Sequence, residues 1–552
     1  MTKPIFAAFA AFAALSIAGA AQAAPPPRPK LILAISVDQY STELFRRYRS
    51  TYTAGLKTLA GGVAYPIGYQ SHAATETCPG HSTILTGRHP AGTGIVANSW
   101  FDPKTGLSVY CVSVPGADSK ARGPQNLKVT TLAEWMKQAK RGARSFAVSG
   151  KDRAAITMAG RNADGIYWWA DGIGFTTSPY AGPADATSLK PIEAFNAALM
   201  ASWKATPPVL WPAPSAACAP LQKRRQFGML TVSGAVPPEM ALGVTEGEDF
   251  INGKRFNEAM RASPAFDAVI ADFAIDLIRR KQLGRGPATD VLAVGLSATD
   301  YVGHRFGNGG PEMCVHQASL DATIGRLLGA IEAMKIPVMV VLTADHGAAD
   351  ASERHFDEGG EAYRIDDKAL MMRLNDAVAA ELGIVWAPLD TDDPQQIFVK
   401  VDPEDAPKER VIEATVNWLK AQPDVKAVFT RAEVEAATVP PGTSPDRLTM
   451  VQRFRQSYDP ERSGDIAVAY AERASYGAPR NVGDGVAGHG TPWDYDRQVP
   501  ILFWWPGALA ENREQPIETV DIAPTLAGVA GIKVTVPVDG RCLDLGGNCA
   551  QK

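Results

Sequence analysis

Short apolar runs, each leading to polar residues, recur along the chain. "KLILAISV" runs up to Asp38, "DVLAVGLSAT" to Asp300 and "PVMVVLTA" to Asp345, and "QVPILFWW" starts shortly after His489. Runs of this length are typical of strands buried on both faces of a parallel sheet. Amphipathic stretches such as "VHQASLDATIGRLLGAIEAMK" predict the crossover helices. The pattern therefore predicts an α/β fold with a mainly parallel central sheet.

Two stretches interrupt this alternation. Residues 167–285 are rich in Pro, Ala and aromatic residues and have a weaker pattern, which indicates an insertion or lid beside the core. Residues 395–436 give a strand–helix–strand pattern, which indicates a second inserted α/β segment. We expect residues 24–552 to form one large domain that carries both insertions.

The N-terminus has the pattern of a secretory signal peptide. Lys3 precedes an apolar run from Ile5 to Ala21, and "AQA" ends at Ala23. We expect residues 1–23 to be removed near Ala23 and the mature protein to be periplasmic or secreted, the alternative being an uncleaved anchor. No later apolar run is long enough to predict a membrane span.

Charge argues against a nucleic-acid partner. The formal net charge is -4, and the sequence has no Lys/Arg-rich run of the kind that binds polyanions. The chain also has no sustained pattern of an oligomer interface, so we expect a monomer.

The six cysteines fit export to an oxidising compartment. We expect a short-range disulfide between Cys542 and Cys549, near the C-terminus. Cys78–Cys111 and Cys218–Cys314 would then be the remaining pairs, and the sequence leaves other pairings open. None of the cysteines has zinc-finger spacing.

Acidic and histidine residues lie close to the predicted strands, and most of them lie where a strand ends. Because ligand sites of open α/β sheets lie beyond the carboxyl ends of the strands, these side chains are candidate metal ligands. Three carboxylates and three imidazoles suit zinc, which takes N and O ligands. The six candidates are Asp38, Asp300, His304, Asp345, His346 and His489. The other histidines are expected to be structural or on the surface: His72, His81, His89, His316 and His355.

The sequence contains no G-x-S-x-G motif of the kind that marks a serine nucleophile. The candidate nucleophile is instead Thr77, in "ETCPGHSTILTG", just before a predicted helix. Pro79 suits the first turn of a helix, and the free N–H groups there favour an anion. A hydroxyl next to a metal at such a helix start could attack a phosphate. The alternative is that Thr77 only caps the helix.

Three further residues could hold the oxygens of a phosphoryl group. Lys151 and Arg153 follow a strand-like run, and Asn98 lies in "GIVANSW". Lysine supplies a point charge, arginine a planar fork and asparagine a neutral donor. The alternative for the Lys-x-Arg pair is a solvated loop.

Taken together, these motifs resemble the alkaline phosphatase superfamily, on the branch shared with type I phosphodiesterases and nucleotide pyrophosphatases. The resemblance is closest to bacterial exported alkaline phosphatases that use a threonine nucleophile, and it spans most of the mature chain. It is carried by "SVDQ", "TETCPGHSTILTG", "GIVANSW", "ATDYVGH", "TADHG", "AGHGTP" and the late helix "VDIAPTLAGVAGI".

The resemblance implies a three-layer α/β sandwich with two Zn²⁺ ions per chain and a covalent phosphothreonine at Thr77. One zinc ion would take Asp38, Thr77, Asp345 and His346 as ligands. The other would take Asp300, His304 and His489.

Lys151 and Arg153 decide between the two substrate classes of this branch. Its diesterases lack the Lys-x-Arg pair, whereas the alkaline phosphatases that this chain resembles have it beside the phosphate-binding Asn98. We therefore expect hydrolysis of a broad range of small phosphate monoesters. The sequence shows no carboxylate set for a third, magnesium site, whose electrostatic effect Lys151 could supply.

Three alternatives have less support. A phosphodiesterase or nucleotide pyrophosphatase would share the zinc site. A sulfatase would need a C-x-P-x-R-type motif, from which "CPGHS" and "CAPLQ" both depart. A non-catalytic metal- or phosphate-binding protein would have lost the nucleophile or a ligand, and none is missing.

Overall fold

A computed structural model describes residues 26–549, apart from 184–187, 248, 362 and 401–405. The expected signal peptide, residues 1–23, lies outside the described residues. Within the described ranges, no helix combines the length and the apolar character needed to cross a membrane.

In this part of the chain, ten strands form one central sheet, in the order β19–β2–β18–β11–β1–β10–β5–β6–β7, with β20 also pairing with β2. Neighbours from β11 to β6 in this order are parallel. The strands are β1 (Leu31–Val37), β2 (Val63–Tyr69), β5 (Ser145–Ser149), β6 (Gly165–Ala170), β7 (Gly174–Thr176), β10 (Asp290–Leu296), β11 (Val338–Thr343), β18 (Gln498–Trp504), β19 (Glu511–Asn512) and β20 (Ile517–Glu518).

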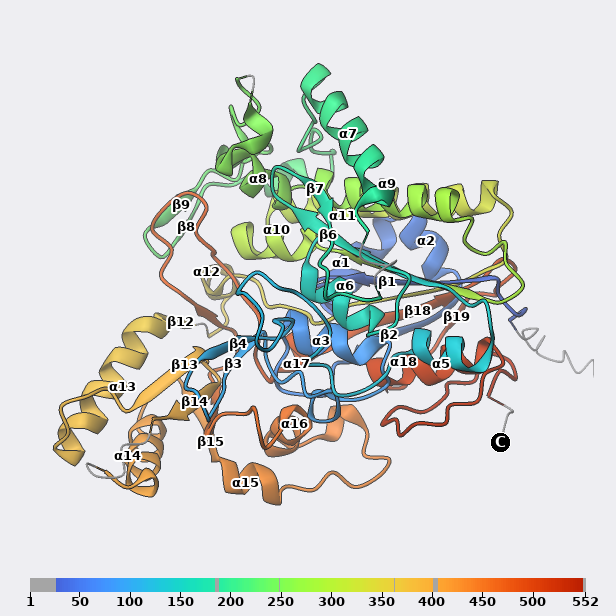
Figure 1. Cartoon of the computed structure of the whole chain (residues 1–552). Coiled ribbons are helices and arrows are strands. Elements are labelled where there is room, and N and C mark those ends of the chain that lie inside the picture. The colour runs from blue at the N-terminus through green and yellow to red at the C-terminus, as the bar shows by residue number, and fades with distance from the viewer. Residues whose placement is uncertain (1–25, 184–187, 248, 362, 401–405, 550–552) are drawn as a thin grey trace, which may run out of the picture.

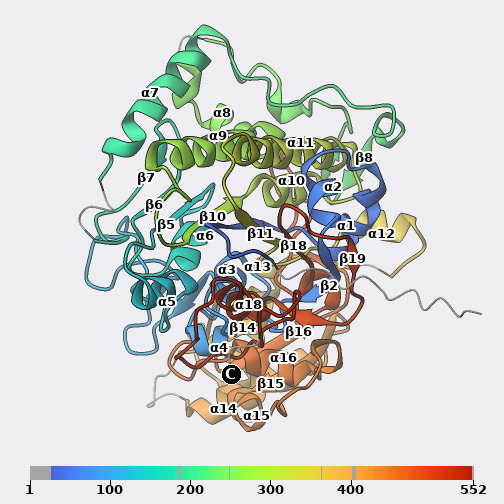
Figure 2. The same cartoon turned by 90° about the vertical axis from the view of Figure 1, so that its right-hand side faces the viewer.

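Helices cover both faces of this sheet, which gives the expected three-layer sandwich (Figures 1 and 2). Alternate residues of β1 point to opposite faces. Leu33 and Ile35 pack with α1 (Thr42–Tyr48), α2 (Gly55–Ala60), α9 (Pro264–Lys281), α10 (Ala298–Phe306) and α11 (Pro311–Ala333). Ile32 and Ala34 pack with α3 (Thr77–Ile84), α5 (Leu132–Ala139), α6 (Asp152–Ala159) and α18 (Ile522–Val529). The central strands are therefore buried on both sides.

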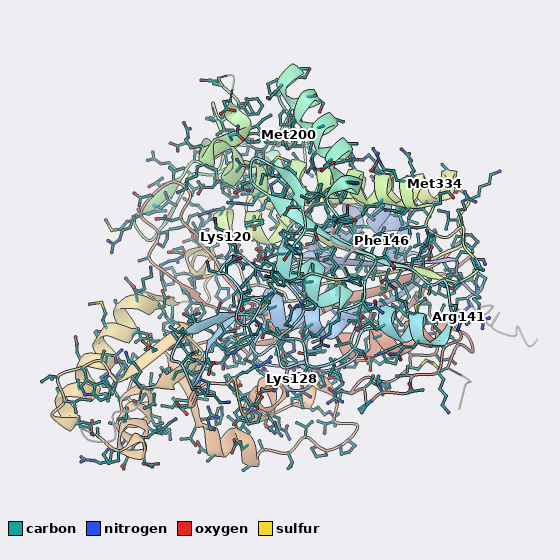
Figure 3. All side chains as sticks on the ribbon, viewed as in Figure 1. Lys120, Lys128, Arg141, Phe146, Met200 and Met334 are labelled. Carbon is teal, nitrogen blue, oxygen red and sulfur yellow. A yellow bond between two sulfur atoms is a disulfide. The ribbon has the colours of Figure 1, made fainter. Side chains whose placement is uncertain are left out.

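The burial of the side chains agrees with these layers (Figure 3). Phe146 of β5 is buried in the interior, whereas Lys120 and Arg141 are exposed on loops.

β18 corrects one expectation, because it pairs antiparallel with both β11 and β2. Its apolar run correctly predicted a buried strand, but burial on two faces does not fix the direction of a strand. Its direction places the beginning of β18 at the edge where the parallel strands end.

The stretch 167–285 contributes to the core as well as to its surroundings. It contains most of β6, all of β7 and the long helix α9, which belong to the central sheet and its helical layer. Its other elements are α7 (Lys190–Ala205), β8 (Arg225–Phe227), β9 (Leu230–Val232) and α8 (Lys254–Arg261).

The strand–helix–strand pattern over residues 395–436 lies inside a larger unit with its own hydrophobic core (Figure 1). Its four-stranded sheet has the order β13–β14–β16–β15. The unit comprises α13 (Asp367–Leu382), β13 (Leu389–Asp393), β14 (Gln396–Val399), α14 (Lys408–Lys420), β15 (Val425–Thr430) and β16 (Ile466–Tyr470).

Short elements connect these layers. They are α4 (Pro90–Thr93), β3 (Ser99–Phe101), β4 (Ser108–Tyr110), α12 (Ser352–Asp357), β12 (Tyr363–Ile365), α15 (Arg431–Ala436), α16 (Met450–Ser457), β17 (Ala474–Tyr476) and α17 (Asp494–Arg497). The 3₁₀ turns are Arg49–Thr51, Ala219–Leu221, Glu239–Ala241, Phe250–Asn252, Pro445–Arg447 and Thr519–Asp521.

All three expected disulfides are present: Cys78–Cys111, Cys218–Cys314 and Cys542–Cys549. The first joins the start of α3 to the residue after β4, and the second joins the 167–285 stretch to α11. Three disulfides are consistent with an exported protein.

Candidate active site

Four neighbouring parallel strands deliver polar side chains to one edge of the sheet. Asp345 follows β11, Asp38 follows β1, Asp300 lies in the first turn of α10 after β10, and Lys151 follows β5. Because parallel strands end at the same edge, these residues converge from sequence positions that lie far apart.

Two more residues reach the same edge by other routes. His489 precedes β18, and an antiparallel strand begins where its parallel neighbours end. Thr77 is the first residue of α3, which follows β2. The His489 Nδ1 atom lies 2.8 Å from the carbonyl oxygen of Thr75, so the two segments are joined beside the candidate nucleophile.

The six predicted metal ligands are brought together in two overlapping groups. Possible ligand atoms of Asp38, Asp345 and His346 all lie within 4.8 Å of one another, as do those of Asp300, His346 and His489. His304 belongs to the second group through its Nε2 atom, which is 3.2 Å from Asp300 Oδ1. His346 stands between the groups, with its ring stacked on that of His489 at 3.6 Å.

Several buried polar atoms of these two groups lack a hydrogen bond within the described part of the chain, which indicates that the groups could bind a cation. Asp300 Oδ1, Asp345 Oδ2 and His346 Nε2 are buried and make no well-aligned hydrogen bond with the described residues, although histidine nitrogens lie 3.2 Å from Asp300 Oδ1 and 2.9 Å from Asp345 Oδ2. Burying such atoms is costly unless something compensates them, and a bound divalent ion would do so. The mixture of carboxylate and imidazole donors fits zinc.

The protonation states of two proposed ligands, His346 and Asp300, agree with this interpretation, whereas burial and the charge of Asp345 raise the pKa of Asp38. Burial lowers the pKa of His346 to about 3, so its ring is neutral, which is the form that binds metals. Burial alone would raise the pKa of Asp300, but Lys151 and His304 hold it well below its usual range. Asp300 is therefore ionised.

Lys151 links the two groups. Its Nζ atom lies 2.6 Å from Asp300 Oδ2, 2.8 Å from Asp38 Oδ2 and 3.4 Å from Thr77 Oγ1. Burial alone would lower the pKa of Lys151, but the two carboxylates raise it above its ordinary value. A permanent positive charge therefore lies next to the candidate nucleophile.

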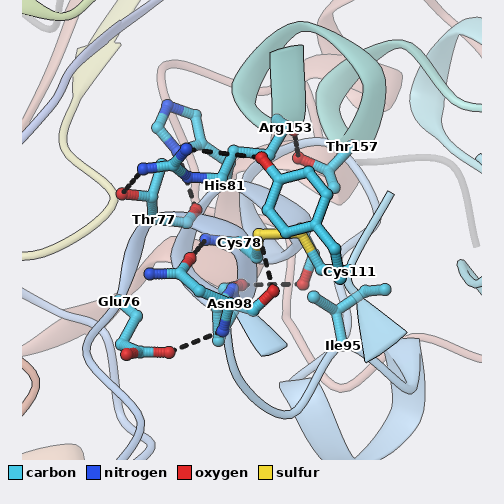
Figure 4. Close-up of a disulfide and its surroundings, with 12 residues drawn as sticks. Glu76, Thr77, Cys78, His81, Ile95, Asn98, Cys111, Arg153 and Thr157 are labelled. Atoms are coloured by element: carbon cyan, nitrogen blue, oxygen red, sulfur yellow. Dashed lines mark hydrogen bonds between the residues drawn. A yellow bond between two sulfur atoms is a disulfide. The ribbon is translucent and has the colours of Figure 1, made fainter. Parts of the chain in front are cut away.

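Thr77 does not serve as the cap of α3. The capping position is Glu76, and no side chain of the described residues makes the capping hydrogen bond. The Thr77 hydroxyl is buried and lies 3.5 Å from Arg153 Nη2 (Figure 4). This contradicts the alternative in which Thr77 only caps the helix.

Asn98 is fixed beside the start of α3, next to Thr77 (Figure 4). Its Oδ1 atom accepts a hydrogen bond of 2.9 Å from the Cys78 N–H, and its backbone N–H donates to Glu76 Oε2 at 2.6 Å. Neither bond uses the NH₂ group of Asn98, so this group is available to a bound oxygen.

Reasoning from the sequence missed two supporting residues. His81 Nδ1 lies 2.9 Å from Asp345 Oδ2 and 2.9 Å from the Thr77 carbonyl oxygen. Its position four residues after Thr77, on the same helix face, was a signal that could have identified it. The hydroxyl of Tyr110 contacts Arg153, and nothing in the local sequence around Tyr110 pointed to that role.

Comparison with known proteins places this geometry in a family. A sequence model of the type I phosphodiesterase/nucleotide pyrophosphatase family matches residues 32–490. This range includes every candidate site residue.

Individual relatives support the same family assignment. The alkaline phosphatase PhoK of a Sphingomonas species is 40% identical, over 94% of this chain and 91% of its own length. The alkaline phosphatase PhoD of Zymomonas mobilis is 38% identical, over 94% of this chain and 88% of its own length. The crystal structure of the alkaline phosphatase PafA has the same fold, with a TM-score of 0.78 at 24% identity, over 94% of this chain and 98% of that one. This chain belongs to the type I phosphodiesterase/nucleotide pyrophosphatase family of the alkaline phosphatase superfamily.

Proposed function

We propose that this protein is an alkaline phosphatase that hydrolyses a broad range of small phosphate monoesters to an alcohol and inorganic phosphate. The observation that carries the proposal is the position of two cations at the nucleophile: Lys151 Nζ and Arg153 Nη2 lie 3.4 and 3.5 Å from Thr77 Oγ1. Similarity to proteins named alkaline phosphatase supports the same activity.

We propose two Zn²⁺ ions per chain. Asp38, Thr77, Asp345 and His346 would hold one, and Asp300, His304 and His489 would hold the other. Ions at these positions would lower the pKa of a coordinated hydroxyl group and stabilise negative charge on the attacking and leaving oxygens.

Thr77 Oγ1, after losing its proton, would attack phosphorus and form a phosphothreonine as the P–O bond to the alcohol breaks. Water would then attack phosphorus, break the bond to Thr77 and release inorganic phosphate. Throughout, the Arg153 guanidinium and the Asn98 amide would donate hydrogen bonds to the non-bridging oxygens. The N-terminus of α3, where Thr77 lies, also favours an anion.

Charge favours monoesters over diesters at this site. A monoester dianion presents three non-bridging oxygens, whereas a diester presents two and carries a second organic group. Lys151, Arg153 and Asn98 offer three separate donors around Thr77, which matches the monoester. The rival function is a phosphodiesterase or nucleotide pyrophosphatase, in keeping with the description of the family.

We also propose that the mature protein is a monomer, exported to the periplasm or beyond the cell. The three disulfides support export, because such bonds persist in oxidising compartments.

The first experiment compares kcat/KM for an aryl phosphate and for its methyl diester. We expect a large preference for the monoester in the wild type. The double variant Lys151→Ala/Arg153→Ala should lose at least about 100-fold more activity on the monoester than on the diester. Arg280→Ala, on the exposed side of α9, is the control for loss of a cation far from the site. A diester preference in the wild type, or equal losses on both substrates, would overturn the assignment.

A second experiment tests the nucleophile and the metals. Mass spectrometry of rapidly quenched enzyme should find phosphate on the peptide that contains Thr77, and Thr77→Ala should abolish both this label and turnover. Independently of turnover, elemental analysis should find about two zinc ions per chain. Asp300→Asn should lower that number, and an unchanged metal content would exclude the proposed ligand set.

A further inference from the structure

The hairpin β3–β4 joins two parts of the phosphate site. It begins directly after Asn98 and ends at Tyr110, and the Cys111 N–H donates to the Asn98 carbonyl oxygen at 2.9 Å. Cys111 also forms the disulfide with Cys78, the residue after Thr77 (Figure 4). Tyr110 is therefore attached through its neighbour to the segment that carries the nucleophile.

The hydroxyl of Tyr110 lies between Arg153 and Asp152. It donates a hydrogen bond of 2.7 Å to Asp152 Oδ1 and accepts one of 3.3 Å from Arg153 Nη1. This direction is fixed by chemistry, because a guanidinium can only donate and an ionised carboxylate can only accept. The lone pair of the hydroxyl is therefore directed at Arg153.

Arg153, Tyr110, Asp152 and Arg122 form a row of side chains. Arg122 is the end of this row that lies farther from Thr77. Its Nε atom donates to Asp152 Oδ2 at 2.9 Å, and its guanidinium lies over the Tyr110 ring at 5.0 Å. Its Nη1 atom donates to the carbonyl oxygens of Ser119 and Ala121 at 2.8 and 3.0 Å. The outer end of the row is thus anchored to backbone.

This row of side chains fixes the orientation of the planar Arg153 guanidinium group. Nη1 is held by Tyr110 while Nη2 lies at Thr77 Oγ1, and Nε is buried without a partner among the described residues. A long arginine side chain has considerable rotamer freedom, so a fork fixed at one nitrogen loses less entropy when it binds phosphate. Small displacements of such a group reduce catalysis, because positioning contributes to the rate.

We propose that Tyr110 and Asp152 are positioning residues that hold Arg153 on the transferred phosphoryl group and thereby determine the preference for monoesters. The inference rests on the proposed function and adds two residues to it. A purely structural role would be different: Tyr110 would only stabilise its hairpin, and Asp152 would only provide a negative charge in the first turn of α6.

A double-mutant cycle between Tyr110→Phe and Arg153→Ala tests the proposal. We expect Tyr110→Phe to lower kcat/KM for the aryl phosphate about tenfold and to change that for the methyl diester less than about twofold. In the Arg153→Ala background, Tyr110→Phe should have no further effect on the monoester. Inhibition by inorganic phosphate should weaken in parallel.

Tyr65→Phe is the matched control, because the Tyr65 hydroxyl also accepts a hydrogen bond from an arginine, Arg513 Nη1 at 2.7 Å, but lies on β2, next to the edge strand β19. It should leave the monoester-to-diester ratio unchanged. Asp152→Asn keeps the size of the side chain and provides a second test should Tyr110→Phe fail to fold, with the same selective loss expected.

Two results would overturn the inference. Equal losses on both substrates, or losses that multiply in the Arg153→Ala background, would show that Tyr110 acts through general stability and not through Arg153. A wild type that prefers diesters would instead contradict the proposed function itself, so the two failures are distinguishable.

Discussion

His81 occupies a position that connects the proposed nucleophile, Thr77, to a proposed metal ligand, Asp345. Its ring is buried in α3, and its Nδ1 atom lies 2.9 Å from both the Thr77 carbonyl oxygen and Asp345 Oδ2. Partners that orient a ligand are important for metal sites, because they fix the direction of the donor atom.

We predict that His81→Ala lowers the zinc affinity of the group around Asp345 by about 10- to 100-fold. Competition with a chelator, followed by metal analysis, measures this without reference to turnover. His355→Ala, on α12, is the control among the histidines expected to have no role at the site. Unchanged affinity in His81→Ala would show that Asp345 is oriented by other groups.

At the scale of residues, the sequence predicted the groups that follow apolar runs, and the structure brings all ten candidates, from Asp38 to His489, to one edge of the sheet. The spacing from Thr77 was the one signal for His81, and there was none for Tyr110. Their roles depend on partners such as Asp345 and Arg153, which are distant in the chain, and local patterns contain no information on such contacts.

At the scale of elements, α3 closely approaches the segment that follows β11. A Cβ atom on Gly80 would lie 1.9 Å from the backbone oxygen of Asp345, where no side chain can fit. The missing side chain therefore lets the helix place Thr77 beside the group that contains Asp345.

We predict that Gly80→Ala displaces α3 and reduces kcat/KM by at least about 100-fold, because a shift of about 1 Å can cost that much. Gly329→Ala, in α11, is the control: it has open space around its Cβ position and should be neutral, or stabilising by about 0.5–1 kcal/mol. Steady-state kinetics and thermal unfolding measure both variants. Full activity in Gly80→Ala would refute the requirement for close approach.

The disulfide at the hairpin gives a second prediction at this scale. Cys78→Ala/Cys111→Ala should lower kcat/KM by at least about tenfold, because it releases the hairpin that carries Asn98 and Tyr110. It should also lower stability by about 2–4 kcal/mol.

Cys542→Ala/Cys549→Ala is the matched control, since it removes a disulfide beside α18 and should leave kcat/KM unchanged. Chemical denaturation and kinetics distinguish the two effects. If both double variants lose activity equally, the Cys78–Cys111 bond has no special role at the site.

The sequence predicted the elements better than their arrangement. The runs at β1, β10 and β11 correctly indicated buried parallel strands, but the equally apolar run at β18 is antiparallel. Similarly, Tyr167 to Ala170 belong to β6 although their surroundings looked like an insertion. Strand direction and sheet membership depend on long-range pairing, which local hydrophobic patterns do not encode.

For the whole molecule, Asp267 links stability to pH. It is buried in α9, where Oδ1 accepts a hydrogen bond of 2.9 Å from the Ala298 N–H at the start of α10. Burial raises its pKa to about 7. The folded protein therefore holds this proton more tightly than the unfolded chain, whose aspartates have a pKa of about 3.9.

The stabilisation from this proton is complete below about pH 4 and is lost as the pH rises through about 7. We predict that Asp267→Asn removes this dependence. The free energy of unfolding of the variant, relative to the wild type, should increase by up to about 4 kcal/mol between pH 4 and pH 8. Urea denaturation across this range measures the difference. A constant difference would mean that Asp267 has the same pKa in both states.

The antiparallel direction of β18 has a consequence for the order in which the protein is made. His489 reaches the site only because this late strand returns between β2 and β11. When Asp38 and Thr77 have already emerged from the ribosome, the nascent chain still lacks the imidazole that we propose completes the ligand set. β2 and β11 cannot pair with β18, their common neighbour, until residues 498–504 have been synthesised. The proposed site can therefore be completed only after almost the whole chain, up to β18, is available to fold.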